Sequence, residues 1–322
     1  MDTEVLIVGG GLSGLALADR LTQRGTDFLL VEAQDRLGGR IATHIVGGAA
    51  FDLGPTWFWP GQPRMAALAE RFQIPVFEQH YAGDLMFQDQ TGAIQRGRGY
   101  ASMQGSYRLA GGMGALIDAL AAAIDGARVL TNTRLKTVQH ATGRITATLD
   151  QAGTPVTVTA SQIVLAIPPR VAADTVRFEP EIDSGQRQSL EQVPTWMAGQ
   201  AKIVAVYDTP HWRNAGLSGD AMSHRGPLVE IHDASPPEGG PYALFGFVGV
   251  PADARASHRD ALMQLALEQL QSLFGPEMAR PIDLVLQDWA SFPDIARALD
   301  RAPVRQHPHG VAPNIKALAA TG

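Results

Sequence analysis

The sequence predicts an α/β protein with two domains, the first built on a parallel, Rossmann-like sheet and the second on a mixed sheet of the α+β type. A strand–helix–strand unit occupies the first 31 residues, and residues 163–167 form another apolar, β-prone run. After residue 170 the chain becomes polar and is interrupted by prolines. With 322 residues, the chain is long enough for two domains of ordinary size.

The N-terminal unit begins with a short apolar run, Glu4 to Val8, which stops at Gly9. The amphipathic stretch from Ser13 to Arg24 predicts a helix, and Phe28 to Val31 predicts the next buried strand. The crossover between two parallel strands joined in this way is right-handed in nearly all proteins. We therefore expect one βαβ unit at the start of the chain.

The remaining elements follow from the same periodicities. Helices are predicted over residues 63–72, 113–124 and 257–274. Strands are predicted over residues 128–130, 135–140, 144–149, 155–159, 163–167, 201–207, 228–231 and 242–248, with a hairpin over 85–95. We expect residues 1–60 and 100–170 to form the first domain, with 285–322 returning to it, and residues 61–99 and 171–284 to form the second.

Composition excludes several classes of function. The net charge is −6 and the charges are scattered, which disfavours nucleic acid and anionic membranes as partners. The chain has no cysteine, so it has no disulfide and no thiolate metal site, as suits a reducing compartment. No apolar run reaches the roughly 18 residues that span a bilayer, and we expect no signal peptide, because the first residues enter a predicted strand without a basic stretch before it. We expect a cytoplasmic protein; the sequence is silent on its oligomeric state.

The first motif with chemical meaning is the G-x-G-x-x-G pattern Gly9-Gly10-Gly11-Leu12-Ser13-Gly14, which lies between the first strand and the first helix. Glycines there permit a tight turn, let the backbone approach a pyrophosphate and bring helix and strand together. The helix N-terminus adds free N–H groups. Glycine-rich turns also occur without ligands, so the motif alone is weak.

Glu32 ends the second strand, about twenty residues further on. A carboxylate at this place accepts hydrogen bonds from the ribose of a dinucleotide and disfavours the additional phosphate of NADP. An exposed carboxylate at the end of a strand is the plainer interpretation. The glycine motif before it favours the ribose role.

The segment from Glu32 to Arg40 indicates which dinucleotide is bound, FAD or NAD. Ala33, Arg36, Gly38 and Gly39 lead to Arg40, whose guanidinium suits a doubly charged pyrophosphate. The alternative is a surface loop in which the arginines pair with nearby carboxylates. Two adjacent glycines flanked by arginines so soon after Glu32 favour FAD. Because the chain has no cysteine, the flavin cannot be attached through a cysteinyl bond, and we expect it to be bound non-covalently.

At this point the sequence resembles the flavin-containing amine oxidase family, the monoamine oxidase and polyamine oxidase group, over almost its whole length. Residues 51–57 look like the family segment that passes the flavin ring, which implies cofactor contacts by Gly54, Pro55, Thr56 and Trp57. Residues 129–137, with Leu135, are similar to the strand whose backbone meets the adenine. Residues 164–169 match the strand and Pro-Pro turn that leave the FAD domain.

The resemblance also implies a catalytic residue. The strand around Lys202 is like the one that carries the family's flavin-facing lysine, and Trp212 after Pro210 fits the same pattern. A lysine there binds the flavin N5 through a water and stabilises the anion that forms as oxygen accepts electrons. The alternative is an exposed lysine at a strand edge. Trp57, Phe58 and Trp59 are candidates to orient the amine, although aromatic residues near a proline more often anchor loops.

The C-terminal part departs from the family pattern. The family continues after a segment like residues 287–290 into a glycine-rich loop and helix over the FAD, whereas this chain stops at Gly322. We therefore expect it to lack the family's C-terminal FAD-binding segment. His307 and His309 are expected to be loop residues, and no metal site is expected.

The function that the resemblance implies is oxidation of a neutral amine by FAD, giving an imine that hydrolyses to an aldehyde or ketone and ammonia. Oxygen would be the acceptor and hydrogen peroxide the second product. The alternative enzymes are a carotenoid or protoporphyrin desaturase and a renalase-like oxidase of reduced nicotinamides. The alternative outside enzymes is a non-catalytic, vestigial flavin-binding protein.

Overall fold

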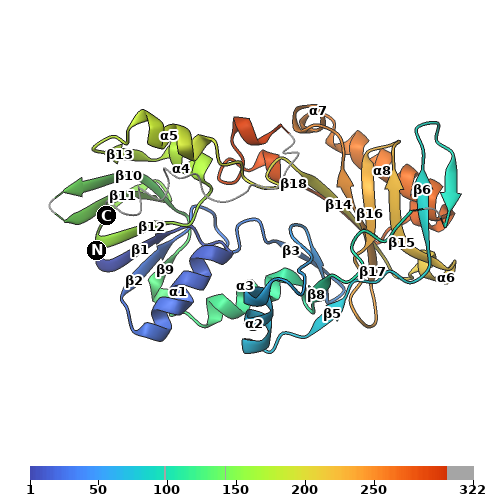
Figure 1. Cartoon of the computed structure of the whole chain (residues 1–322), viewed down its shortest axis with the longest axis horizontal. Coiled ribbons are helices and arrows are strands. Elements are labelled where there is room, and N and C mark those ends of the chain that lie inside the picture. The colour runs from blue at the N-terminus through green and yellow to red at the C-terminus, as the bar shows by residue number, and fades with distance from the viewer. Residues whose placement is uncertain (98, 142, 303–322) are drawn as a thin grey trace. The chain divides into compact units, whose positions relative to one another are not determined.

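The structure, a computed structural model, describes residues 1–97, 99–141 and 143–302. The described residues form two compact units: the first comprises residues 1–40, 117–199 and 289–302, and the second comprises residues 41–116 and 200–288. Both units carry a large sheet with helices, so the predicted α/β class is confirmed (Figure 1). The predicted division into a cofactor domain and a substrate domain stays a prediction. His307 and His309 lie outside the described residues.

The sheet of the first unit has the strand order β13-β10-β11-β12-β1-β2-β9. Its parallel part is formed by β1 (Asp2–Val8), β2 (Phe28–Val31) and β9 (Val129–Leu130), and α1 (Leu12–Arg24) connects β1 to β2. The expected βαβ unit is therefore present.

The antiparallel part of this sheet consists of β10 (Thr133–Ala141), β11 (Arg144–Gln151) and β12 (Thr154–Leu165), with β13 (Arg177–Glu179) at its edge. The prediction of separate strands over 155–159 and 163–167 was wrong, because β12 runs through both. Its first half pairs with β11 and its second half pairs in parallel with β1, so the polar residues between them keep hydrogen-bonding partners.

One apolar cluster of the first unit lies on one face of this sheet. Leu6 and Val8 of β1 pack with Leu29 and Val31 of β2 and with Leu135 of β10, all of them buried. The period-2 alternation of apolar residues along β10 and β11 places these side chains on one face. Two short helices, α4 (Pro169–Thr175) and α5 (Ser184–Glu191), follow β12 in the polar segment.

The sheet of the second unit has the order β18-β14-β17-β16-β15-β6-β7. The strands are β6 (Asp84–Gln88), β7 (Ile94–Arg96), β14 (Ala201–Tyr207), β15 (Leu217–Ser223), β16 (Leu228–Asp233), β17 (Tyr242–Val248) and β18 (Asp283–Asp288). The predicted strands over 201–207 and 242–248 and the hairpin over 85–95 are confirmed. Sequence reasoning missed β15 and β18, because both are rich in serine, aspartate or glutamine and lack a clear apolar alternation.

Each face of this second sheet has its own apolar cluster. Ile203 and Ala205 of β14 pack against α8 (Arg259–Phe274), which covers one face (Figure 1). Val204 of β14 and Phe245 of β17 pack on the opposite face against Phe51. Successive residues of a strand point to opposite faces, so Lys202 shares the second face with Val204.

The other elements of the second unit are shorter. They are the hairpin β3 (Thr43–Val46) and β4 (Ala49–Asp52), the pair β5 (Val76–Glu78) and β8 (Tyr107–Leu109), and helices α2 (Pro63–Arg71), α6 (His211–Asn214) and α7 (Ala252–Ala256). The predicted helix over 113–124 is α3 (Gly112–Ala122), which bridges the boundary at residue 116. Among the described residues, no helix is long and apolar enough to cross a membrane.

Candidate functional site

The glycine loop between β1 and α1 is shaped by two close backbone approaches. Gly9 has φ +110°, and a Cβ on it would lie 2.6 Å from the carbonyl oxygen of Ala166. A Cβ on Gly14 would lie 1.9 Å from the carbonyl oxygen of Gly9. Only glycine fits at both positions, so these two residues hold strand and helix together.

Gly11 has a different role, because it leaves space open. It is the N-cap of α1 in an extended conformation, and no side chain caps the helix there. A Cβ on Gly11 would find no atom closer than the carbonyl oxygen of Gly38 at 4.0 Å. The N–H groups of the first helical turn, which begins with Leu12 and Ser13, are thus available to an anion, as in a phosphate-binding helix N-terminus.

Glu32 is buried, and its carboxylate fixes the backbone of the glycine loop at Gly10. Its Oε2 accepts a hydrogen bond from the Gly10 N–H at 2.6 Å, and its Oε1 accepts one from the Gln34 N–H at 2.8 Å. The interpretation of Glu32 as an exposed strand-end carboxylate is therefore wrong. Each carboxylate oxygen has a further lone pair, so ribose binding by Glu32 stays a prediction that the geometry permits.

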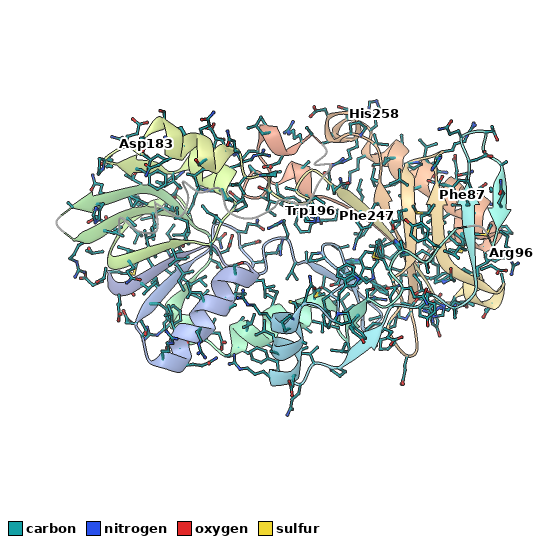
Figure 2. All side chains as sticks on the ribbon, viewed as in Figure 1. Phe87, Arg96, Asp183, Trp196, Phe247 and His258 are labelled. Carbon is teal, nitrogen blue, oxygen red and sulfur yellow. The ribbon has the colours of Figure 1, made fainter. Side chains whose placement is uncertain are left out.

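The second loop, from Arg36 to Arg40, is tied to the first. The Gly38 N–H donates to the Gly10 carbonyl at 2.8 Å, and Arg36 donates to the carbonyl oxygens of Leu37 and Gly39. Arg36 therefore shapes the loop. Arg40 donates to the carbonyl oxygen of Trp196, which is labelled in Figure 2, at 2.7 Å. Its predicted contact with a pyrophosphate stays a prediction, as do those of Ala33 and of the Leu135 backbone.

These features together fit the diphosphate end of a dinucleotide. An open glycine, an uncapped helix N-terminus and a buried carboxylate lie within one βαβ unit. Sequence reasoning predicted their position in the βαβ unit, since the spacing of the motif reflects the local geometry of the βαβ turn, and their binding of a dinucleotide stays a prediction.

The second unit contains a buried cationic centre at Lys202. This residue lies on β14, between β18 and β17, and only 3% of it is exposed. Its Nζ donates to the carbonyl oxygens of Asp52 and Gly54, at 3.0 and 2.8 Å, and to Thr56 Oγ1 at 2.8 Å. All three N–H donors of a protonated Lys202 thus have acceptors, and the interpretation as an exposed edge lysine is wrong.

Burial and neighbouring charges set the protonation of this centre. Burial lowers the pKa of Lys202 to about 7, against the opposing effect of the Asp52 carboxylate. Burial raises the pKa of Asp52, and Lys202 and Arg108 oppose that shift. Arg108, itself buried, donates to the carbonyl oxygens of Ala234 and Ser235. Lys202 is therefore a group that gains and loses a proton near neutral pH.

Aromatic rings surround Lys202 on its face of the sheet. Its Nζ lies 4.0 Å from the centroid of the Phe245 ring, and Trp57 lies 5.3 Å from Phe245 and 6.3 Å from Phe247 (centroid to centroid), the last labelled in Figure 2. Trp57 is fixed by a hydrogen bond from its Nε1 to Gln79. Of the three predicted aromatic candidates, only Trp57 joins this group; Phe58 is buried against Tyr107, and Trp59 is exposed.

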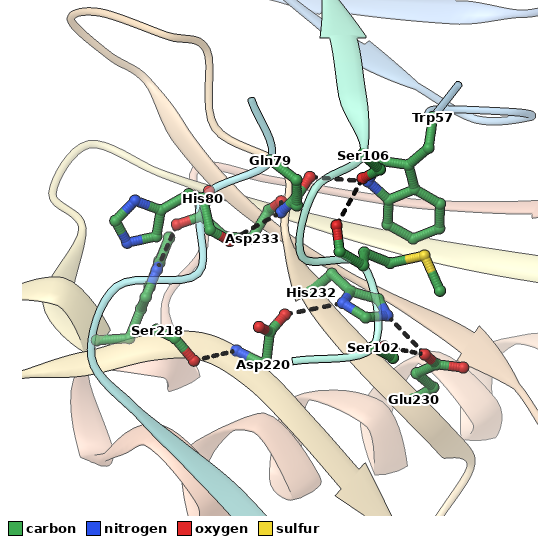
Figure 3. A network of polar contacts seen from close by, with 12 residues as sticks. Trp57, Gln79, His80, Ser102, Ser106, Ser218, Asp220, Glu230, His232 and Asp233 are labelled. Carbon is green, nitrogen blue, oxygen red and sulfur yellow. Dashed lines mark hydrogen bonds and ion pairs between the residues drawn. The ribbon is translucent and has the colours of Figure 1, made fainter. Parts of the chain in front are cut away.

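A polar network lies beside these rings (Figure 3). The His232 ring bonds to Asp220 through Nδ1 at 2.8 Å and to Glu230 through Nε2 at 3.0 Å, and it packs edge-on against Trp57. Burial opposes protonation of His232, but the hydrogen bonds to the two carboxylates outweigh it and raise its pKa above the usual value. The hydrogen bond from His232 lowers the pKa of Glu230, which is therefore ionised.

Sequence reasoning missed Asp52, Arg108, Asp220, Glu230 and His232. One signal was present: Glu230 and His232 are two residues apart on β16, so their polar side chains point to one face. Asp220 comes from the neighbouring strand β15, which the sequence analysis did not predict. Among the described residues, no group of three or more histidine, aspartate or glutamate side chains is arranged to hold a metal ion.

Comparisons with known proteins identify similar chains. The family model described as flavin containing amine oxidoreductase matches residues 12–92 and 76–312. A putative flavin-containing monoamine oxidase of Mycobacterium tuberculosis is 28% identical over 393 residues, covering 89% of this chain and 83% of the relative. The putrescine oxidase of Kocuria rosea is 22% identical, covering 90% of this chain and 83% of the relative.

Solved structures show the same fold. A wild-type putrescine oxidase bound to putrescine superposes with a TM-score of 0.80 at 21% identity, covering 92% of this chain and 87% of the other. A cyclohexylamine oxidase from Brevibacterium oxydans superposes with a TM-score of 0.80 at 19% identity, covering 98% of this chain and 90% of the other.

Proposed function

This chain belongs to the family of flavin-containing amine oxidoreductases, and we propose that it oxidises a neutral amine to an imine with FAD and passes the electrons to molecular oxygen. The class of activity follows from the family: the protein is an FAD-dependent oxidoreductase that acts on amines. Hydrolysis of the imine then gives an aldehyde or ketone and ammonia.

FAD is the cofactor, and the first unit contains the residues that we propose to bind its diphosphate and ribose. The single observation that carries this assignment is the open backbone at Gly11, where the N-terminus of α1 has no side-chain cap. The N–H groups of Leu12 and Ser13 would meet a phosphate, Glu32 the ribose, and Arg40 the second negative charge of the pyrophosphate. Bound FAD would supply the two-electron oxidation of the carbon–nitrogen single bond to an imine. Molecular oxygen would then accept the two electrons and form hydrogen peroxide.

We propose that Lys202 is the catalytic residue of the oxygen half-reaction. A protonated Nζ places a positive charge where negative charge develops as oxygen is reduced, and the buried surroundings strengthen that interaction. Thr56 Oγ1 is one of its three acceptors, and a water could take that place without loss of the two backbone contacts. Gly54, Pro55, Thr56 and Trp57 keep their proposed role beside the flavin ring.

The rings of Trp57, Phe245 and Phe247 are proposed to orient the substrate. Aromatic faces hold an alkyl chain and exclude water, so the amine is desolvated and kept in one orientation. An amine that arrives protonated must lose that proton before its α-carbon can donate a hydride equivalent. No protein base is required if the amine binds neutral. We also propose a cytoplasmic location, on the basis of the chain's lack of cysteine.

The test is to purify the protein with added FAD, measure the flavin content, and assay peroxide release. Primary amines, α,ω-diamines and reduced nicotinamides should be assayed in parallel. Peroxide release with an amine supports the proposal. Release with nicotinamides alone, or peroxide from no amine in a protein that retains FAD, overturns it.

A further inference from the structure

The first unit contains a tight turn over residues 195–198. The Ala198 N–H donates to the Thr195 carbonyl oxygen at 3.1 Å, and Met197, the third residue of the turn, has φ +61°. A positive φ at the third position is typical of a type II turn, in which the carbonyl group of the second residue points to the side opposite to that in a type I turn. The second residue here is Trp196. The conformation of Met197 therefore sets the direction of the Trp196 carbonyl group.

This carbonyl group holds Arg40. The Trp196 carbonyl oxygen accepts a hydrogen bond from one terminal nitrogen of Arg40 at 2.7 Å. A guanidinium has five N–H donors, and Arg40 makes no other hydrogen bond among the described residues, so most of its donors are open to a ligand. A methionine rarely adopts a positive φ and keeps it only where the surrounding structure imposes it. The structure around the turn must therefore supply that restraint.

Asp300 restrains the turn at both of its ends. Its side chain is 0% exposed, and its Oδ1 accepts a hydrogen bond from the Thr195 N–H at 3.0 Å. At the other end, a Cβ on Gly199 would lie 2.3 Å from the carbonyl oxygen of Asp300, so the two backbones touch and only glycine fits. The Asp300 side chain thus fixes the start of the turn, and the Asp300 backbone limits the position of its end.

Asp300 is itself held in one orientation. Arg170 donates to its Oδ1 at 2.5 Å, and the Arg297 N–H donates to its Oδ2 at 3.0 Å. Arg170 also donates to the carbonyl oxygens of Glu191 and Leu299. The Arg170 charge balances that of the buried carboxylate, as a buried ion requires. Asp300 is therefore a fixed point on which the turn can be braced.

We propose that Asp300 is a positioning residue for FAD binding: it braces the turn at 195–198, and the Trp196 carbonyl group then keeps the Arg40 guanidinium in the orientation that binds the pyrophosphate. This inference rests on the proposed function, which assigns the pyrophosphate contact to Arg40. An arginine side chain loses much rotamer freedom when it binds a ligand. The hydrogen bond to Trp196 removes part of that loss from the binding step. Asp300 acts through the turn and does not touch the cofactor.

The test is a double-mutant cycle of Arg40→Met and Asp300→Ala, with the Kd of FAD for the FAD-free protein measured by fluorescence titration. We expect each single variant to bind FAD about tenfold more weakly. The double variant should bind no more than about twofold more weakly than Arg40→Met, because Asp300 acts through Arg40. Asp174→Ala removes the carboxylate that pairs with Arg297 in the same segment, and this matched control should leave the Kd unchanged.

Three outcomes of the cycle overturn the inference. Losses that multiply to about a hundredfold in the double variant show that Asp300 affects binding independently of Arg40. Tighter binding in Asp300→Ala shows that its negative charge merely repels the pyrophosphate. Unchanged binding in Arg40→Met removes the contact that Asp300 would position. Since no amine is present, a protein that shows the expected cycle but oxidises no amine contradicts the proposed function alone.

Two variants at Met197 test the turn while leaving the buried ion pair of Asp300 intact, so they decide the matter even if Asp300→Ala fails to fold. Met197→Pro fixes φ at about −65° and excludes the positive value, so FAD should bind about tenfold more weakly. Met197→Gly adopts a positive φ without steric cost and should bind FAD as the unchanged protein does. Equal Kd values for these two variants overturn the inference.

Discussion

At the scale of single residues, the chemistry of the second unit depends on one buried lysine and the carboxylate beside it. Lys202 donates three hydrogen bonds, yet burial brings its pKa to about 7. Asp52 is the counter-charge that favours its protonated form. Each residue therefore controls when the other is charged, and each can be tested separately.

Lys202→Met removes the charge while keeping a side chain of similar length. We expect the reaction of reduced flavin with oxygen to slow by about a hundredfold, because the developing anion loses its stabilising cation. Reduction of the flavin by the amine should change much less. Stopped-flow mixing of the reduced protein with oxygen measures this rate, and Lys136→Met, at an exposed lysine of the first unit, is the matched control. An unchanged rate would contradict the assigned role.

Asp52→Asn tests the electrostatic coupling through the pH profile. The Asp52 charge raises the pKa of Lys202, so its removal must lower that pKa further below the present value of about 7. The protonated lysine is then lost at lower pH, and the alkaline limb of the oxygen reaction should move toward acid by about one pH unit or more. A limb that stays in place, or moves toward alkali, shows that the Asp52 charge does not act on Lys202.

At the scale of elements, the G-x-G-x-x-G turn combines two kinds of glycine. Gly14 is required because α1 packs on the backbone of Gly9, whereas Gly11 keeps space open above the helix N-terminus. The sequence motif predicts the turn but does not separate these roles. Only the surroundings of each Cα position do so.

Gly14→Ala and Gly11→Ala should therefore differ. A Cβ on Gly14 would lie 1.9 Å from a carbonyl oxygen, so Gly14→Ala should destabilise the FAD-free protein by several degrees in Tm as well as reduce its FAD content. Gly11 has an ordinary backbone conformation and free space, so Gly11→Ala should lose FAD with little change in that Tm. Thermal melting with and without FAD measures both. Equal Tm losses in the two variants would contradict the distinction.

At the scale of the whole molecule, the sequence predicted what depends on local spacing. The βαβ unit, Glu32 and strands β14 and β17 follow from periodicity and from the glycine motif, and the family resemblance is confirmed. The hydrogen-bond acceptors of Lys202 could not be predicted, because they lie about 150 residues away, on Asp52, Gly54 and Thr56. The network of Asp220, Glu230 and His232 could not be predicted either. Asp220 joins it only through the pairing of β15 with β16, and β15 was not predicted.

The central claim is that the chain oxidises an amine with FAD, and one measurement tests it most directly. The FAD-loaded protein is mixed with 1,4-diaminobutane or with a monoamine in the absence of oxygen, and the absorption of oxidised flavin is followed. We predict that it bleaches with one equivalent of amine per flavin and returns, with release of hydrogen peroxide, when oxygen is admitted. Oxidised absorption that persists with every amine tried would contradict the account.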